Sequence, residues 1–268
     1  MPPPTEFTKL TELTDFPDFP DFRRDDAGTV LLSPWIVPDA AFQRPAADSV
    51  LAEWEHRQRP DAMLSLTAFL STDGSHVLHY AQWTDDDAHR EWGRTKRPAV
   101  VGRIDAAIPG IRRPGLVRYR RYRSYVPPRP VGRRPALLVT PAFATAGADA
   151  QRALADTVVD LLTREQVPGL LGAHFHLSQD GERVLNVAEW TDTSAWREFV
   201  DHGASARLLR AAVDALAGVT PAPAVLAQPA TAADDPGGPE APQLPAVPQY
   251  HLYKSLINIS ARTPTEGT

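Results

Sequence analysis

The sequence has no cysteine among its 268 residues. This absence excludes disulfide bonds, thiolate metal sites and a cysteine nucleophile together. Uninterrupted apolar runs are also short, and none approaches the roughly 18 residues that a membrane-spanning helix needs. The amino-terminal stretch MPPPTEFTKL has neither the basic nor the apolar region of a secretion signal. We therefore expect a cytoplasmic protein without a membrane partner.

The chain also has no excess of positive charge. The chain carries 28 Lys and Arg against 33 Asp and Glu, a net charge of −5. Nucleic-acid-binding domains usually show a basic patch, so we expect no nucleic-acid partner. A basic run between Arg112 and Arg134 coincides with a predicted strand and its exit loop. We interpret this run as a solvated or substrate-facing surface.

What the sequence does contain is an internal repeat. VLHYAQWTDDDAHREW, from Val77, returns as VLNVAEWTDTSAWREF, from Val184. A shift of 107 positions aligns residues 71–92 with 178–199 without a gap, and 12 of these 22 positions are identical. Near the C-terminus the shift becomes 131, so the second copy carries an insertion of 24 residues, rich in Pro, Ala and Gly, at about 225–248. Such self-similarity indicates a duplicated structural unit, and the insertion is typical of an exposed loop.

Each copy predicts the same order of elements. An apolar strand, at 29–37 or 136–143, precedes an amphipathic helix, a hairpin with an Asp-Gly turn, further helix and a last strand. The order β-α-β-β-α-β is that of a ferredoxin-like unit. We therefore expect an α+β protein, in which two tandem ferredoxin-like domains, at 29–130 and 135–260, form an intramolecular α+β barrel. Residues 1–28 are expected to form an extended arm that docks its Phe side chains on the barrel, or serves as a lid or strap.

Candidate chemistry lies in the second hairpin. Side chains two apart share a face of a strand, so Asn186 and Trp190 point the same way. Whether His176 joins them depends on the turn at Asp180 and Gly181. A two-residue turn puts His176 and Asn186 on opposite faces, and a three-residue turn with a bulge brings them together. The sequence leaves both registers open.

These features resemble the antibiotic biosynthesis monooxygenase superfamily, small oxygenases that tailor aromatic polyketides without metal. The resemblance rests on the duplicated ferredoxin-like pattern, the W-T-D ending of the third strand and the Asn186-x-x-x-Trp190 spacing, and it covers residues 29–126 and 136–258. Anthrone oxygenases of this family carry a pocket His, Asn, Trp and Arg. The matching positions in the second copy are His176, Asn186, Trp190 and Arg210.

The two copies depart from the family pattern to different degrees. In the second copy Trp196 replaces an aromatic hydroxyl. In the first copy Phe69 stands in place of the His and His79 in place of the Asn, whereas Trp83 and Arg103 persist. The resemblance therefore implies that the second copy is catalytic and that the first is structural or modified.

The resemblance also implies the activity, an oxidoreductase of aromatic polyketide antibiotic biosynthesis. Tandem members of this length are similar to oxygenases that open or contract the B ring of angucyclines, and the substrate would be a polycyclic phenol or hydroquinone. His176 would be the base or proton shuttle, Asn186 and the indole N–H of Trp190 would donate hydrogen bonds, and Arg210 would pair with a phenolate. The candidate substrate-binding residues are His174, Trp196, His79, Trp83 and His202.

No metal or tightly bound cofactor is expected, and O2 would be the co-substrate. The chain has no Gly-rich dinucleotide motif, which leaves open whether a separate flavin reductase supplies reduced FMN or FAD. The sequence does not distinguish a monomer from a homodimer.

Four alternatives stay open. They are oxidation of an anthrone to a quinone, haem degradation, an iron site built from His174, His176 and a carboxylate, and a ligand-binding barrel without chemistry. The haem alternative fits poorly at His202, and a bare His-x-His is weak evidence for iron. A strand Trp is also more often a core residue than a ligand contact, so each assignment has a structural alternative.

Overall fold

The computed structural model describes residues 19–55, 60–127, 134–224 and 247–257. The first half contains β1 (Thr29–Ile36), a short 3-10 turn (Ala40–Phe42), α1 (Gln43–Glu55), β2 (Met63–Ser71), β3 (His76–Trp83), α2 (Asp86–Thr95), α3 (Arg97–Ala107) and β4 (Val117–Tyr125). The second half contains β5 (Leu137–Val139), β6 (Ala142–Thr145), α4 (Ala148–Glu165), β7 (Leu170–Ser178), β8 (Arg183–Trp190), α5 (Thr193–His202), α6 (Ala204–Asp214), β9 (Val219–Ala222) and β10 (Gln249–Ile257).

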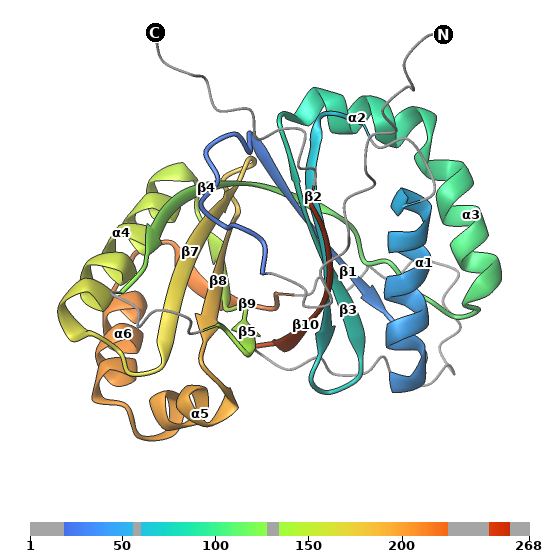
Figure 1. The fold of residues 1–268 in the computed structure, drawn as a ribbon. Coiled ribbons are helices and arrows are strands. Elements are labelled where there is room, and N and C mark those ends of the chain that lie inside the picture. The colour runs from blue at the N-terminus through green and yellow to red at the C-terminus, as the bar shows by residue number, and fades with distance from the viewer. Residues whose placement is uncertain (1–18, 56–59, 128–133, 225–246, 258–268) are drawn as a thin grey trace, which may run out of the picture.

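The strands close into a barrel shared by both halves. Its order is β5-β10-β2-β3-β1-β4-β7-β8, and β8 pairs again with β5, while β6 and β9 extend the sheet from β8. Two long strands connect the halves. β4 leaves β1 to pair with β7, and β10 leaves β5 to pair with β2. The helices of each half cover the outside (Figure 1). The predicted α+β class and the tandem ferredoxin-like arrangement are thereby confirmed.

Local sequence signals account for most element boundaries. Asp85 and Asp192 cap α2 and α5, because each side chain accepts a hydrogen bond from the backbone N–H three residues later. Gly181 supplies the positive φ of the second hairpin turn. The predicted strand at 136–143 is instead divided into β5 and β6, and the division coincides with a change of neighbour, from β10 beside β5 to β9 beside β6.

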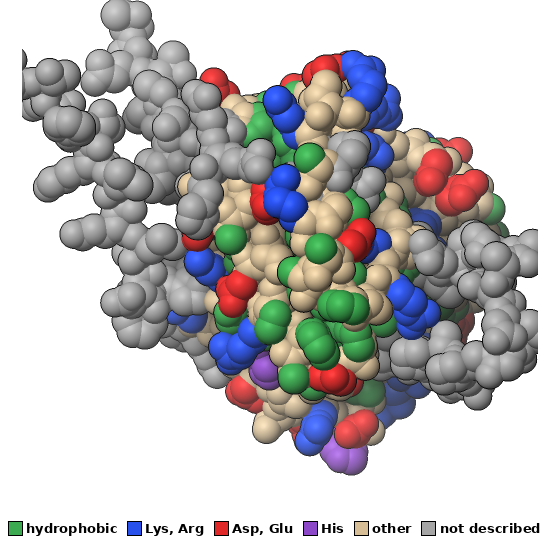
Figure 2. Space-filling view, turned by 90° about the vertical axis from the view of Figure 1, so that its right-hand side faces the viewer, with side chains coloured by type: hydrophobic (Ala, Val, Ile, Leu, Met, Phe, Trp, Pro, Cys, Tyr) green, Lys and Arg blue, Asp and Glu red, His purple; other side chains and the backbone are tan. Residues whose placement is uncertain are grey.

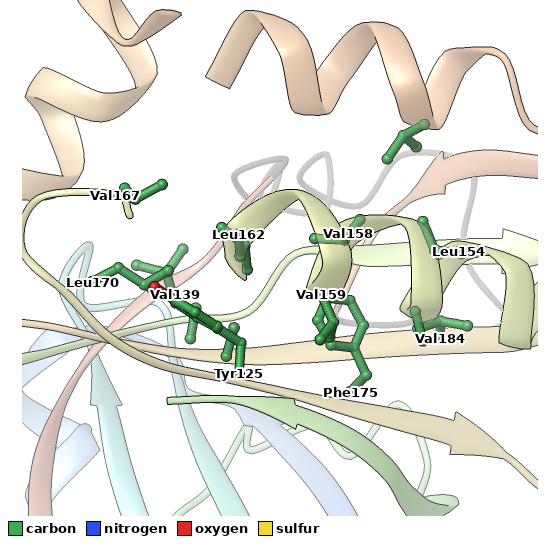
Figure 3. Close-up of a cluster of buried hydrophobic side chains, with 14 of the residues drawn as sticks. Tyr125, Val139, Leu154, Val158, Val159, Leu162, Val167, Leu170, Phe175 and Val184 are labelled. Carbon is green, nitrogen blue, oxygen red and sulfur yellow. The ribbon is translucent and has the colours of Figure 1, made fainter. Parts of the chain in front are cut away.

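Three apolar clusters fill the molecule. One lies between α1, α3 and the sheet of the first half, and another lies between α4 and the sheet of the second half. Figure 3 shows the second of these, with Leu154, Val158, Val159 and Leu162 of α4 directed at the strands. The third cluster is the barrel interior, to which both halves contribute. Each sheet therefore has two buried faces, and the face on which a side chain lies decides which compartment it enters.

The described part of the amino-terminal arm enters the barrel. The ring of Phe22 is buried against Tyr80 and His174, at 5.1 Å from each, and Phe19 packs on Phe69 at 5.8 Å. This placement supports the docked interpretation of the arm. Residues 1–18 and most of the predicted insertion, 225–246, lie outside the described residues.

The basic run after Arg112 is tied into ion pairs. Arg121 pairs with Asp25 at 2.8 Å, and Arg123 pairs with Asp156 at 2.6 Å. On the face that Figure 2 shows, acidic and basic side chains are likewise interspersed. Among the described helices, none has the length and apolar character to cross a membrane.

Candidate active site

The helix-facing side of β8 presents Asn186, Ala188 and Trp190 to the space under α4 and α5. Trp190 is 2% exposed, and its ring packs against Trp196 at 5.3 Å and Phe199 at 5.2 Å. These two rings come from α5, which begins directly after the W-T-D ending of β8. We call Asn186, Trp190, Trp196 and Phe199 the second-half layer.

Two polar atoms of this layer have no partner. Asn186 Oδ1 and Trp190 Nε1 are buried, and neither makes a hydrogen bond to any residue that the structure describes. An unsatisfied buried polar atom costs about 1–3 kcal/mol, and native proteins retain few of them without a functional or solvent partner. A carboxamide can present either its oxygen or its nitrogen after rotation. The layer therefore offers a hydrogen-bond acceptor or donor at Asn186 and a donor at Trp190 to a ligand between aromatic rings.

His176 does not belong to this layer. The observed register pairs His176 with Leu185 and Phe175 with Asn186. A two-residue turn would give the same register, although the loop itself spans 179–182, with the N–H of Gly181 donating to the carbonyl oxygen of Ser178. Phe175 therefore faces the helices, beneath Val159 of α4 (Figure 3), and His176 faces the barrel interior. The expectation that His176 and Asn186 share a pocket is wrong. The physical reason is that the apolar Phe175 packs on α4, and strand alternation then sends the histidine to the other face.

The hydrogen bonds of His176 define its tautomer. Its Nδ1–H donates to the carbonyl oxygen of His174 at 2.9 Å, so Nε2 accepts from the Tyr80 hydroxyl at 3.1 Å. Burial, followed by the neighbouring His174, lowers the pKa of His176 to about 3. The ring is a neutral imidazole whose two nitrogens are engaged, and it cannot reach a ligand beside Asn186.

His174 also faces the barrel interior. Its Nε2 lies 3.0 Å from Glu189 Oε2 and its Nδ1 lies 3.0 Å from Ser124 Oγ. Gly172 makes room for this pair, because a Cβ there would overlap the Glu189 carboxylate. The sequence alone indicates no role for Ser124, Tyr80 or Glu189. Strand alternation could have placed Glu189 with His174 once the register was known.

The histidines and carboxylates do not converge on a metal position. Across the described ranges, no group of three or more His, Asp or Glu side chains is arranged to hold a metal ion. His174 and Glu189 bind each other, and His176 binds Tyr80 and a backbone carbonyl. The iron alternative therefore gains no support from the geometry.

Two predicted residues lie on the surface. Arg210, on α6, is exposed, and His202, at the end of α5, is exposed as well. The backbone oxygen of His202 accepts a hydrogen bond from Arg207, while its ring lies at the surface. Arg210 therefore does not belong to the buried layer, and its pairing with a substrate stays a prediction.

The corresponding layer of the first half is richer in titratable groups. His79 and Trp83 lie on the helix-facing side of β3, and His89 of α2 packs on Trp83 at 5.0 Å. Arg103, which matches Arg210, is held by Glu53 of α1 at 2.5 Å. Burial lowers the pKa of His79 to about 4. His79 and Trp83 are thus brought together in one layer, as their strand spacing predicts.

A surface cavity of about 770 Å³ lies at the seam between the halves. Its lining residues are Leu116, Val117, Arg118, Ala144, Thr145, Gln179, Asp180, Glu182 and Arg183. None of the predicted site residues lines it, and its two arginines already contact Asp86 and the backbone of Pro223.

Comparison with known proteins finds one family match, in the second half. A family model described as antibiotic biosynthesis monooxygenase matches residues 141–211. This range contains β7, β8, α5 and the whole second-half layer. Among curated proteins, none matches the sequence.

Solved structures were found at low sequence identity, and one of them superposes well enough to show a shared fold. An anthrone oxidase-like protein superposes with a TM-score of 0.58 at 13% identity, over 85% of this chain and 93% of its own. A Streptomyces coelicolor monooxygenase from the gene ActVA-Orf6, solved with nanaomycin D, is 24% identical over 41% of this chain and all of its own, with a TM-score of 0.35. A heme-degrading enzyme from Listeria monocytogenes is 8% identical over 70% of this chain and 89% of its own, with a TM-score of 0.39. The first of these shows a shared architecture across nearly the whole chain.

Proposed function

Because the second half carries a domain of the antibiotic biosynthesis monooxygenase superfamily, we propose that its layer oxidises a polycyclic phenol or hydroquinone with O2 and without a metal. The observation that carries the proposal is the pair of buried, unpartnered polar atoms, Asn186 Oδ1 and Trp190 Nε1, on one strand face. The rings of Trp196 and Phe199 beside them suit a flat aromatic ligand.

Molecular oxygen is a triplet and reacts slowly with closed-shell molecules, so a site without metal needs an electron-rich anion as substrate. Asn186 can accept the hydrogen bond of a substrate hydroxyl, and the indole N–H of Trp190 can stabilise negative charge on a phenolate or enolate oxygen. Such donors are most effective in a site that excludes water, as the burial of Trp190 provides.

The oxidation of an anthrone to a quinone by O2 balances without any further reactant. Oxidation of its methylene to a carbonyl releases four electrons, one oxygen atom enters the carbonyl, and the other leaves as water. Cleavage of an angucycline B ring needs two electrons beyond the oxygen insertion, and a hydroquinone substrate or reduced flavin would supply them. The two products differ in mass, so they separate the two proposals.

The position of His176 limits the substrates. Its ring lies on the opposite face of the sheet from the second-half layer. Among the described residues, the layer holds no imidazole or carboxylate, so the site contributes hydrogen bonds rather than a proton acceptor. Substrates that ionise readily, such as anthrones and hydroquinones with adjacent hydroxyls, fit this limit best.

The test is O2 uptake by the metal-stripped protein with an anthrone or an angucycline hydroquinone under ¹⁸O2, with and without reduced FMN. We expect turnover above the uncatalysed rate and one ¹⁸O atom in the product. A flavin requirement together with a ring-opened product would favour B-ring cleavage, and a quinone without flavin would favour anthrone oxidation. Tight binding of the substrate without turnover would overturn the proposal and identify a binding barrel.

A further inference from the structure

We call His79, Trp83 and His89 the first-half layer, and its side chains differ in chemistry from those of the second-half layer. At the shared offset of 107, His79 occupies the position of Asn186, Trp83 that of Trp190 and His89 that of Trp196. An amide and an indole are therefore replaced by two imidazoles on either side of a common Trp. A neutral imidazole offers one ring nitrogen as a hydrogen-bond acceptor, which an indole does not.

His79 differs from the other buried histidines. The structure describes five of them, and His76, His89, His174 and His176 each have a side-chain hydrogen-bond partner. His79 is 4% exposed, and neither ring nitrogen makes a hydrogen bond of normal geometry within the described ranges, although an interaction with the backbone of Ser33 partly opposes the lowering of its pKa by burial. A buried polar group without a full partner costs free energy, which a bound molecule that donates a hydrogen bond would offset.

The surroundings of His79 indicate the chemistry of such a molecule. The ring of Trp35 lies 4.7 Å away at 62°. Its counterpart in the second half is the smaller ring of Phe143, because Trp35 pairs with Val77 and Phe143 pairs with the matching Val184. The guanidinium of Arg113 stacks on Trp35 at 4.2 Å and is paired with Asp105 nearer the surface. The site thus combines a neutral imidazole, an aromatic wall and a fixed cation.

Arg113 also keeps the imidazole in its accepting form. Its positive charge adds to burial in disfavouring a second proton on His79. A hydroxyl could donate a hydrogen bond to the ring, and the guanidinium would stabilise partial negative charge on the hydroxyl oxygen. The arrangement suits a phenol rather than a carboxylate, which could not donate to His79 at neutral pH.

We propose that the first half holds a second, chemically different binding site, in which His79 accepts the hydrogen bond of a phenolic hydroxyl beside Trp35 and Arg113. The two halves then bind phenols by different means, through an imidazole in one and through an amide and an indole in the other. This site is separate from the proposed oxygenation site and needs no turnover to be observed.

The test is isothermal titration with 1,8-dihydroxyanthraquinone, a phenolic probe that the proposed reaction does not consume. We expect two sites per wild-type chain. His79→Phe should remove one of them and Asn186→Leu the other, whereas His251→Phe, at an exposed position on β10, should leave both. His79→Asn, which installs the residue of the second half, should restore most of the binding that His79→Phe loses.

The outcomes separate the two proposals. A single wild-type site that Asn186→Leu abolishes would overturn the first-half site, and so would two sites that persist in His79→Phe. A single wild-type site that His79→Phe abolishes would support the first-half site and contradict the proposed second-half site. Circular dichroism and melting of each variant would show that it is folded.

Discussion

Single residues determine whether a neighbouring polar side chain lies on the helix side of the sheet or in the barrel interior. Phe175 and His176 are neighbours, yet one packs beneath α4 and the other lies in the barrel beside Tyr80. Gly172 has a comparable role, because the absence of a Cβ leaves the space that the His174–Glu189 pair occupies. Small differences at such positions determine whether a buried network is complete.

We predict that Gly172→Ala destabilises the protein by about 1–3 kcal/mol, as overpacking in a core does. The added Cβ would overlap the Glu189 carboxylate and lie 2.8 Å from His174 Nε2. Gly93→Ala on α2 is the matched control, since a Cβ there meets no described atom within 4 Å and a helix interior gains up to about 1 kcal/mol from this change. Urea unfolding of both variants measures the difference, and equal stabilities would contradict the assignment.

Strands that pass from one half to the other hold the barrel closed. β10 carries Tyr250 from the second half to the first, where its hydroxyl lies 2.8 Å from His76 Nε2 of β3. Burial raises the pKa of Tyr250, so the hydroxyl stays protonated at every physiological pH. This hydrogen bond joins the two halves inside the barrel.

We predict that Tyr250→Phe lowers the free energy of unfolding by about 1–3 kcal/mol, because His76 Nε2 would lose its partner in a buried position. Tyr253→Phe on the same strand is the control. Its hydroxyl binds the exposed Asp48, so its loss should change stability by no more than about 0.5 kcal/mol. Chemical denaturation of the two variants distinguishes them, and a larger effect at Tyr253 would contradict this account of the seam.

The elements themselves could be predicted from the sequence, whereas the register of one hairpin could not. The repeat, the Asp-Gly turns and the Asp caps predict the strands and helices to within one to three residues at most ends. An Asp-Gly turn is compatible, however, with both registers of β7 on β8, and only the packing of Phe175 on α4 selects the observed register. Strand alternation therefore predicted that Asn186 and Trp190 share a face, whereas the face of His176 was left open and follows only from the observed register.

The chain as a whole buries neutral histidines on both faces of its sheet. Burial is the largest cause that lowers the pKa of His76 and His79 to about 4 and of His176 to about 3. In the unfolded chain these groups return to about 6.5 and bind protons that the native state does not. Their contribution to stability is therefore complete above pH 6.5 and is lost as the pH falls toward 4.

We predict that the free energy of unfolding falls steeply between pH 6.5 and pH 4, by up to about 1.4 kcal/mol per pH unit for each of the three histidines. Denaturation at several pH values in this range would measure the slope. His79→Phe should reduce it, because one of the three groups no longer takes up a proton on unfolding. A stability that is constant across this range would contradict neutral burial of these rings.

The central claim is that the second-half layer, with Trp190 as donor, performs the oxygenation. The most direct measurement is the kcat for O2 uptake by Trp190→Phe, which removes the indole N–H and keeps the aromatic wall. We predict a fall of roughly 10²–10³, the usual effect of losing one donor to developing negative charge. Trp54→Phe on α1 of the first half should stay close to the wild-type rate. A wild-type rate in Trp190→Phe, or an equal loss in both variants, would contradict the claim.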